Sequence, residues 1–455
     1  MGWYRNILTI LKSEPEEWLC YLYGQKLEDL PHLMKLKSKY TGFLAQVAKY
    51  VAYILKNAKI NEKKITNSDF LFYFGTENQR SALESTIESL RNKNFQLVMI
   101  APGDLSCNEV NPTFRMTFNP SDILRALILL VRRSRGLFNI LKYKDKTAAA
   151  YFFSKFLCSH IYLCFFYRVL IQSNPEFVVI ANDHSCANRC LLAVARHLEI
   201  KTVYLQHASV SEIFPALCMD YAFLDGVHAL EIYQKCKKNA FDGEKRSPPT
   251  QIFLTGQKKK LPKREDKKGN IIGVATNTTD DAEKIIFLIK YLLSNGLEVR
   301  FRWHPLQPIE DIRKYKNELK ENNLLIFSDP HSEPLADFIS KVAQIICGDS
   351  SIHLEAALSG VIPIYYKATE GDIRDYYGFV SKGLCREAKN PQNLLSFIRG
   401  NIGNREINMH AIQYYSSTFG TKWQGQEGLL AALLLEALIN NDAINRMKIF
   451  PYVLK

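Results

Sequence analysis

The chain has 455 residues, of which 47% are hydrophobic, and it carries a formal net charge of +13 with a sequence pI near 9.1. This length allows two or three domains, and the hydrophobic content excludes a disordered chain. The basic excess favours a negatively charged partner, such as nucleic acid, anionic lipid or a phosphorylated substrate. The ten cysteines stand mostly in apolar runs without paired Cys-x-x-Cys motifs, which is typical of reduced thiols rather than a disulfide framework.

Residues 1–64 are predicted to form an N-terminal helical segment, because their apolar residues recur every three to four positions. The first apolar run is short and interrupted by charge, so we expect no cleavable signal. The most hydrophobic segment, 151–171, carries Lys155, His160 and Arg168 within a length that needs about 20 apolar residues to span a bilayer. We therefore predict a buried helix there and a cytoplasmic protein.

Residues 65–257 are predicted to form a first domain, in which strands and helices alternate. The predicted strands are short apolar runs at 69–75, 94–103, 113–119, 176–183, 201–208, 221–226 and 251–257. The predicted helices lie at 76–93, 121–144, 147–172 and 185–200. This alternation is typical of a parallel sheet with helices on both faces.

Residues 258–269 are polar and basic and contain a proline, which predicts a linker with solvated lysines. The alternation restarts over 270–390, with strands at 270–277, 297–305, 324–329, 343–350 and 361–367 and helices at 280–295, 309–321, 333–341 and 351–359. C-terminal helices follow over 391–455, and we expect them to cross back to the first domain. The sequence thus predicts two doubly wound α/β domains facing a cleft, with ligands beyond the carboxyl ends of the strands.

A Ser-Ser corner stands at one of these strand ends in the second domain. Ser350 and Ser351 begin a predicted helix, where hydroxyls and free backbone N–H groups favour a phosphate. Glu355 follows about one turn along, and its carboxylate can accept hydrogen bonds from the hydroxyls of a ribose. The alternative is that Ser350 caps the helix and that Glu355 points into solvent.

Two further loops of this domain carry polar residues at strand ends. Asn277 and Thr278 follow its first strand, and His304 and Pro305 end its second. Proline fixes the chain direction, and the histidine can donate to a phosphate or protonate a leaving group. A lone histidine is more often structural, but His304 joins a series of polar strand ends that together predict a nucleotide site.

The two Rossmann-like domains, the His-Pro pair and the later Ser-Ser corner resemble bacterial GT-B glycosyltransferases over about residues 65–435. The nearest group is the sialyltransferases and polysialyltransferases, with capsule polysaccharide transferases related to it. The resemblance implies that His304, Ser350 and Ser351 hold the donor phosphate and that Glu355 binds the ribose. It also implies an inverting transfer of an acid sugar, best matched by sialic acid from CMP-sialic acid, to a surface glycan or glycolipid at the inner face of the membrane. CMP-Kdo, a UDP-sugar and a CDP-polyol are the alternative donors.

The general base of such a transfer has three candidates. Sialyltransferases of this kind usually carry an acidic-acidic-Gly motif in the first domain, and Gly-Thr-Glu-Asn stands after Phe74 instead. The candidates are, in order, Asp183, His207 and Glu77, of which His207 resembles the base of polyol-phosphate transferases. Asp183 is equally suited to orient His184 or to cap the next helix.

No metal and no other cofactor is expected besides the nucleotide-sugar, since no Asp-x-Asp motif follows a strand in a suitable place. Asp280 and Asp281 begin a predicted helix and are interpreted as charges that match its dipole. A nucleotide-sugar 2-epimerase has the same two-domain layout and is the alternative enzyme, although residues 349–366 lack the Arg/Thr/Glu/Arg/Pro/Glu signature usual in such enzymes.

Two partners are considered for the basic residues, nucleic acid and an anionic membrane. Nucleic acid is disfavoured, because aromatic residues are not interleaved with the basic clusters. The basic, apolar helix at 122–144 is equally suited to lie on an anionic membrane or to pack on the domain with its cations in water.

Overall fold

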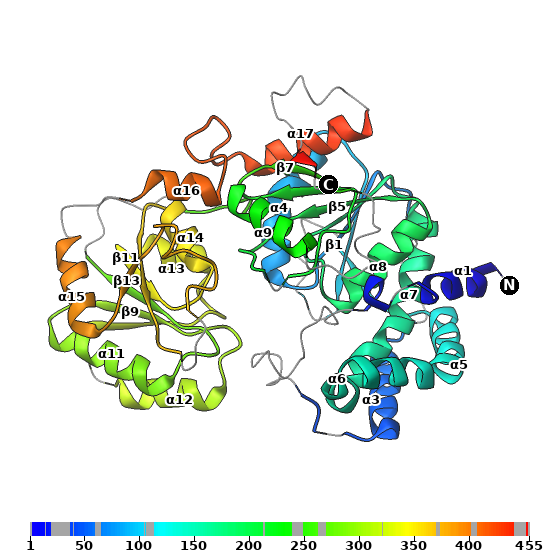
Figure 1. Ribbon diagram of the computed structural model, residues 1–455, viewed down its shortest axis with the longest axis horizontal. Coiled ribbons are helices and arrows are strands. Elements are labelled where there is room, and N and C mark those ends of the chain that lie inside the picture. Colours follow the sequence, from blue (N-terminus) through cyan, green and yellow to red (C-terminus); the bar gives the residue numbers. More distant parts are fainter. Residues whose placement is uncertain are drawn as a thin grey trace. The chain divides into compact units, whose positions relative to one another are not determined.

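The structure is a computed structural model (Figure 1). It describes residues 2–13, 15–19, 37–39, 41–59, 65–103, 105, 113–212, 214–238, 249–262, 270–320, 322–369, 374–401, 407–440 and 452–453. The chain divides into two compact units. Unit 1 comprises Met1–His207, Glu212–Lys259 and Gln426–Lys455, and unit 2 comprises Ala208–Ser211 and Lys260–Gly425.

Unit 1 is built on an eight-stranded sheet. Its strands are β1 (Phe70–Tyr73), β2 (Leu97–Pro102), β3 (Phe114–Met116), β4 (Phe177–Ile180), β5 (Lys201–Leu205), β6 (Tyr221–Leu224), β7 (Gln251–Leu254) and β14 (Tyr452–Val453). They pair in the order β14-β7-β6-β5-β4-β1-β2-β3, and all pairs are parallel except β14 with β7. The strand order reverses between β1 and β4, so the crevice where such sheets bind ligands lies at the carboxyl ends of these two strands.

The helices of unit 1 are α1 (Gly2–Leu11), α3 (Phe43–Lys56), α4 (Glu77–Asn92), α5 (Pro120–Lys144), α6 (Lys146–Tyr151), α7 (Phe153–Ser173), α8 (Cys186–His197), α9 (Val227–Lys238) and α17 (Glu427–Ile439), with a 3-10 turn η1 (Pro15–Glu17). The helix predicted at 147–172 is broken at Phe152, whose φ of −122° and ψ of 4° leave the helical region. Helix α9 is not among the helices predicted from the sequence, and it begins after Asp225 and Gly226, which follow β6.

Helix α7 forms the centre of the helical layer of unit 1. Among the described residues it is the one helix long and apolar enough to cross a bilayer, and 78% of that apolar window is buried inside the protein. It contacts α3, α5 and α8. A buried core helix meets the same criteria of length and composition, and the burial of α7 agrees with the helix predicted there.

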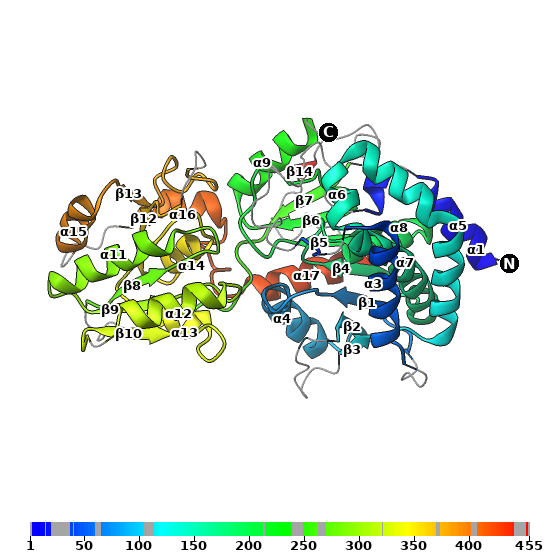
Figure 2. The ribbon, with the colours of Figure 1, turned by 90° about the horizontal axis from the view of Figure 1, so that it is seen from below.

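Unit 2 is built on a six-stranded parallel sheet. Its strands are β8 (Ile272–Ala275), β9 (Val299–Arg302), β10 (Leu325–Ser328), β11 (Gln344–Cys347), β12 (Ile362–Tyr366) and β13 (Arg386–Ala388), in the order β10-β9-β8-β11-β12-β13. Its helices are α11 (Ala282–Ser294), α12 (Ile309–Glu318), α13 (Leu335–Ser340), α14 (Ile352–Leu358), α15 (Pro391–Gly400) and α16 (Met409–Tyr415), seen from a second side in Figure 2. The order reverses between β8 and β11.

The core of unit 2 lies on both faces of this sheet. On one face, side chains of β8 and β9 pack with α11, α12 and α15, and on the other, residues of α13 and α14 pack with β11. The central strands β8 and β11 are buried on both faces, which explains why they appear as continuous apolar runs in the sequence. Each unit is therefore a doubly wound α/β sheet, as the sequence predicts.

Two segments differ from the expected boundaries. Lys258, expected as a solvated lysine of the linker, is buried in unit 1, where its Nζ lies 3.1 Å from Asp225 Oδ1 and 2.9 Å from the Gly256 carbonyl oxygen. A buried ammonium group requires such partners, so unit 1 extends past residue 257.

Residues 263–269 of the expected linker and residues 20–36 of the N-terminal segment lie outside the described residues. Helices α15 and α16 belong to unit 2, whereas α17 packs on α4 of unit 1.

Candidate functional site

In unit 2, three neighbouring strands bring the predicted donor-site loops to one edge of the sheet. Strands β9, β8 and β11 are adjacent and parallel, and their registers keep the carboxyl ends level. The loops at 276–280, 303–305 and 348–351 follow these ends. This edge includes the point between β8 and β11 where the strand order reverses, which is where doubly wound sheets bind ligands.

The loops after β8 and β11 lie close together around Gly348. A Cβ atom at Gly348 would lie 3.4 Å from Asp280 Oδ1, 3.6 Å from the Tyr366 carbonyl oxygen and 3.8 Å from Asn277 Nδ2. These are ordinary contact distances, so the three groups lie closely around Gly348. The structure thus brings Asn277 and the Ser-Ser corner together, as predicted from their strand ends.

The His304 ring is held in one tautomer. Its Nδ1 accepts a hydrogen bond of 3.0 Å from the backbone N–H of Leu306, so in the neutral ring the proton lies on Nε2. Burial lowers the pKa of His304, which favours this neutral form. The half-buried ring therefore carries an N–H donor suited to a phosphate oxygen, next to the exposed Pro305.

The hydroxyls of the Ser-Ser corner cap α14 only weakly. Ser351 is the N-cap residue, yet within the described part of the chain its side chain makes no capping hydrogen bond. The Ser350 hydroxyl accepts a long hydrogen bond of 3.4 Å from the Ile352 N–H. Glu355 is 4% exposed, which contradicts the alternative that it points into solvent. The capping alternative therefore explains neither serine well, and Glu355 is buried one turn along.

His353 shapes this corner, although the sequence analysis did not single it out. Burial lowers the pKa of its ring to about 4, so the ring is neutral near pH 7. Its Nε2 lies 2.9 Å from the carbonyl oxygen of Gly348 and 3.2 Å from the sulfur of Cys347. Because the carbonyl can only accept, Nε2–H is the donor and it fixes the backbone before Ser350. A lone histidine inside an apolar helix gave no sequence signal of this role.

Asp280 is the residue of this edge whose role the sequence analysis assigned wrongly. The helix-terminal role belongs to Asp281, whose carboxylate accepts the backbone N–H of Lys284 at 2.9 Å. Asp280 is 7% exposed, and its Oδ2 accepts the backbone N–H of Asn277 at 2.8 Å. Its buried Oδ1 has no hydrogen-bond partner among the residues that the structure describes. Burial, together with the nearby carboxylate of Asp349, raises the pKa of Asp280 to about 7.

In unit 1, an Asp-His pair lies where β4 ends, at the point where the strand order reverses. Asp183 Oδ1 is 3.0 Å from His184 Nδ1. The side-chain oxygen of Asn182 accepts the backbone N–H groups of His184 and Ser185, at 3.0 and 2.9 Å. The Asn182 amide nitrogen therefore faces His184 Nε2, 3.1 Å away. Since that nitrogen can only donate, His184 Nε2 is an acceptor and Nδ1–H donates to Asp183.

This geometry separates the roles of the two residues. Asp183 is 0% exposed, so its carboxylate is buried behind the ring that it orients. The His184 side chain is 18% exposed, and its ring makes an edge contact with Phe214 at 5.1 Å between centroids. Asp183 has three predicted functions: general base, orientation of His184 and helix cap. Ser185 caps α8 instead, and the buried contact with the His184 ring favours orientation over a direct role as base.

The other two base candidates have contrasting surroundings. Burial, with repulsion from Lys259 and His184, lowers the pKa of His207 to about 3, and its buried Nδ1 has no hydrogen-bond partner in the described ranges. Glu77 is exposed at the start of α4, and its Oε1 accepts a hydrogen bond of 2.9 Å from Arg80 Nε. His207 thus lies near the Asp-His pair as a neutral ring, whereas Glu77 is a solvated surface partner of Arg80.

Known proteins resemble this chain in structure and not in sequence. No family model matches the chain, and no curated protein matches it in sequence. A protein from Listeria monocytogenes assigned as a UDP-N-acetylglucosamine 2-epimerase has a TM-score of 0.52 at 12% identity, over 83% of this chain and 98% of its own. The UDP-GlcNAc 2-epimerase from Neisseria meningitidis, bound to UDP-GlcNAc, has a TM-score of 0.50 at 12% identity, over 82% and 99%. CalG4, the calicheamicin glycosyltransferase, has a TM-score of 0.48 at 9% identity, over 83% and 100%.

Identities this low establish a shared fold and not a shared activity. The two doubly wound sheets form the two-Rossmann-domain architecture of the GT-B fold, and the predicted fold class is confirmed. The alternative enzyme class predicted from the sequence, a nucleotide-sugar 2-epimerase, occurs among the structural neighbours with TM-scores of 0.50 and 0.52.

Proposed function

We propose that the protein is a glycosyltransferase that takes its sugar from a nucleotide-sugar bound at the edge of unit 2. The observation that carries this proposal is that three kinds of group stand at one edge of the sheet, beyond β9 and β11 on either side of β8: the N–H donor of His304, the weakly engaged hydroxyls of Ser350 and Ser351, and the buried carboxylate of Glu355. In this proposal His304, Ser350 and Ser351 bind phosphate oxygens, and Glu355 accepts hydrogen bonds from the ribose hydroxyls.

The donor that we propose is a CMP-linked acid sugar, with sialic acid as the first choice. Its support is the resemblance of the His304-Pro305 pair and the Ser-Ser corner to the sialyltransferase group. The proposed acceptor is a surface glycan or glycolipid, and the basic balance of the chain suits an anionic acceptor. CMP-Kdo, UDP-sugars and CDP-polyols offer the same phosphate chemistry to this site, and the choice of nucleotide distinguishes them.

The proposed reaction inverts the anomeric carbon in one displacement. A base removes the proton of the acceptor hydroxyl, and the acceptor oxygen attacks the anomeric carbon of the sugar. At the same time the bond between the anomeric carbon and the phosphate oxygen breaks. The electron pair of that bond leaves with the nucleotide, whose new negative charge is stabilised by His304 and the serine hydroxyls. We propose His184, oriented by Asp183, as the base, with His207 as the second candidate. No metal is assigned a role, since the sequence lacks an Asp-x-Asp motif at a strand end.

A nucleotide-sugar 2-epimerase is the second candidate, because the two neighbours with TM-scores of 0.50 and 0.52 carry that description. The two functions differ in what they release. A transferase frees a nucleotide only as fast as an acceptor is glycosylated, apart from slow hydrolysis, whereas an epimerase inverts a carbon of UDP-GlcNAc without an acceptor.

The test is to incubate the protein with CMP-sialic acid, UDP-GlcNAc and CDP-glycerol, each with and without a sialylated oligosaccharide acceptor. Free nucleotide is measured by chromatography and the sugar configuration by proton NMR, with and without a chelator. Acceptor-dependent release of CMP supports the proposal. Conversion of UDP-GlcNAc to its 2-epimer replaces it with the second candidate.

A further inference from the structure

Three helices of unit 1, α1, α3 and α5, form an apolar and basic surface. They touch one another through α5: Arg125 and Arg132 of α5 lie over the rings of Trp3 and Tyr4, and Phe43 of α3 contacts Phe138 of α5 at 5.4 Å between ring centroids. Large hydrophobic side chains are exposed on α3 and α5, at Leu44 (79%), Leu55 (63%), Leu124 (61%), Leu127 (36%), Val131 (84%) and Tyr143 (92%).

Helix α5 carries two apolar stripes rather than one. The first is buried against α7 and includes Ala126, Leu129 and Leu137. The second consists of Leu124, Leu127 and Val131, at a spacing of three and four residues, and it is exposed. A helix that only packs on its domain needs the first stripe and not the second. The exposed stripe is therefore unexplained by the fold.

The exposed charges on these helices have one sign. Helices α1 and α3 contain no acidic residue, and the acid of α5, Asp122, is 0% exposed and paired with Arg168 at 2.7 Å. The exposed basic residues are Arg5, Lys49, Lys56, Arg132, Arg133, Arg135, Lys142 and Lys144. Such a surface attracts anions over a range of about 8 Å at physiological ionic strength.

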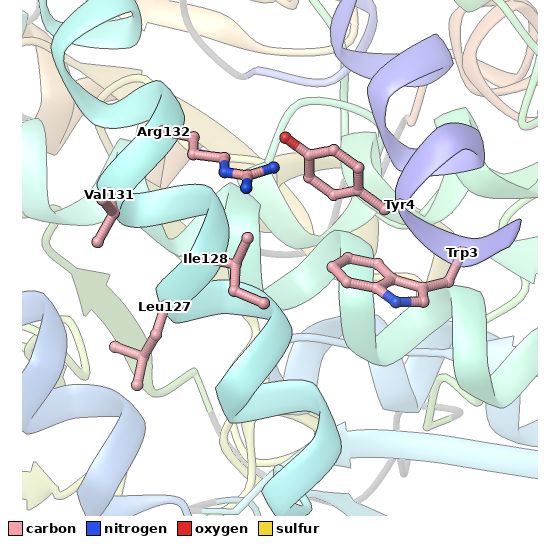
Figure 3. A pocket seen from close by; sticks show the side chains of 6 residues that line it. All are labelled: Trp3, Tyr4, Leu127, Ile128, Val131 and Arg132. Carbon is pink, nitrogen blue, oxygen red and sulfur yellow. The ribbon is translucent and has the colours of Figure 1, made fainter. Parts of the chain in front are cut away.

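Between α1 and α5 this surface is hollowed, as Figure 3 shows. The hollow has a volume of about 430 Å³ and is lined by Trp3, Tyr4, Leu127, Ile128, Val131 and Arg132. Its walls are thus largely apolar, while the Arg132 guanidinium stands 5.3 Å from the centre of the Tyr4 ring. An apolar depression flanked by aromatic rings and cations matches the boundary between lipid headgroups and acyl chains, where tryptophan and tyrosine rings are enriched.

We propose that the α1–α3–α5 surface binds the face of an anionic lipid bilayer. The exposed arginines and lysines contact the lipid headgroups, and Trp3 with the Leu124, Leu127 and Val131 stripe enters the outer part of the acyl layer. A nucleic acid would pair with the same cations but would leave the aliphatic stripe in water, which favours lipid as the occupant. The inference decides between the two interpretations of the 122–144 helix and does not depend on the proposed enzymatic activity.

The first test is cosedimentation of the full chain with vesicles of phosphatidylcholine, alone or mixed with phosphatidylglycerol. Binding is expected for the mixed vesicles, weakening as salt is added. The double variant Arg133→Glu/Arg135→Glu is expected to bind at least about 25-fold more weakly, because each basic residue near an anionic surface contributes roughly fivefold. The control Arg313→Glu, at an exposed arginine of α12 in unit 2, should bind like the parent.

The second test separates apolar insertion from charge attraction. Val131→Asp is expected to weaken binding to the mixed vesicles, whereas Phe287→Asp, at a residue 60% exposed on α11, is expected to have no effect. Both positions are exposed, so circular dichroism should show both variants folded. Trp3→Phe should remove most of the blue shift in fluorescence that the vesicles induce.

Three results would overturn the proposal. The first is equal binding to vesicles with and without phosphatidylglycerol, and the second is parental binding by the arginine and Val131 variants. The third is an arginine-dependent affinity for single-stranded oligonucleotides in a protein that does not sediment with vesicles, which would assign the surface to nucleic acid.

Discussion

Replacing Asp280 by asparagine should stabilise the protein at neutral pH. The folded protein raises the pKa of this carboxyl from 3.8 to about 7, so it holds the proton to a higher pH than the unfolded chain does. The free energy of unfolding of the parent therefore falls as pH rises from about 4 to about 7, and the loss is complete above that. Each unit of difference between the folded and unfolded pKa is worth about 1.4 kcal/mol, so the total loss of unfolding free energy approaches roughly 4 kcal/mol. Asparagine cannot ionise, and its side-chain oxygen can still accept the Asn277 N–H.

The assay is urea unfolding of the intact protein between about pH 4 and pH 8, followed by tryptophan fluorescence. Asp280→Asn and the parent should be equally stable near pH 4, and the advantage of the variant should grow to roughly 4 kcal/mol near pH 8. Asp281→Asn is the matched control, because that partly exposed carboxylate caps α11 and asparagine caps a helix equally well. Parallel pH profiles for Asp280→Asn and the parent would refute the reasoning.

Three other substitutions test the remaining assignments. His304→Ala should lower turnover by about 100-fold or more at an unchanged melting temperature, because it removes a hydrogen-bond donor to the leaving phosphate. Unchanged activity in a nucleotide-release assay would contradict this role of His304. Asp183→Asn should lower turnover by about 100-fold or more, because the His184 tautomer is no longer fixed. Isothermal titration should still show binding of the nucleotide-sugar donor. A loss of donor affinity would instead assign Asp183 to the donor site. Lys258→Met should destabilise the protein by about 3–5 kcal/mol in urea unfolding, because it leaves the carboxylate of Asp225 without its buried cation. A change below 1 kcal/mol would mean that the pair is not buried in solution.

The positions of the three loops at the edge of unit 2 could be predicted from the sequence because their signal is local. Apolar runs that end in polar residues fix where a strand stops, and parallel strands place their carboxyl ends on one edge. Knowing that Asn277, His304 and Ser350 each follow a strand was therefore enough to place them together. The strand order β9-β8-β11, which makes them neighbours, follows the usual rules for doubly wound sheets.

The roles that the sequence missed depend on contacts between distant segments. The burial of Asp280 arises where the loop after β8 meets Gly348 after β11, and a pair of aspartates before a helix gives no sign of it. Lys258 stands in a basic run, and only the fold places it beside Asp225. The tautomer of His184 depends on which way the Asn182 amide points, which no residue pattern records.

The central claim is that the edge of unit 2 binds the phosphate of a nucleotide through the Ser-Ser corner and His304. The most direct measurement is a thermal-shift panel with CMP, CDP, UDP, GDP and NAD, with and without magnesium, on the parent and on Ser351→Ala. Binding to the folded protein alone raises the melting temperature, so CMP should stabilise the parent regardless of magnesium and stabilise Ser351→Ala much less. Stabilisation by UDP or CDP instead would keep the site and change the donor. A melting temperature that no nucleotide raises, or one that CMP raises equally in both proteins, would contradict the claim.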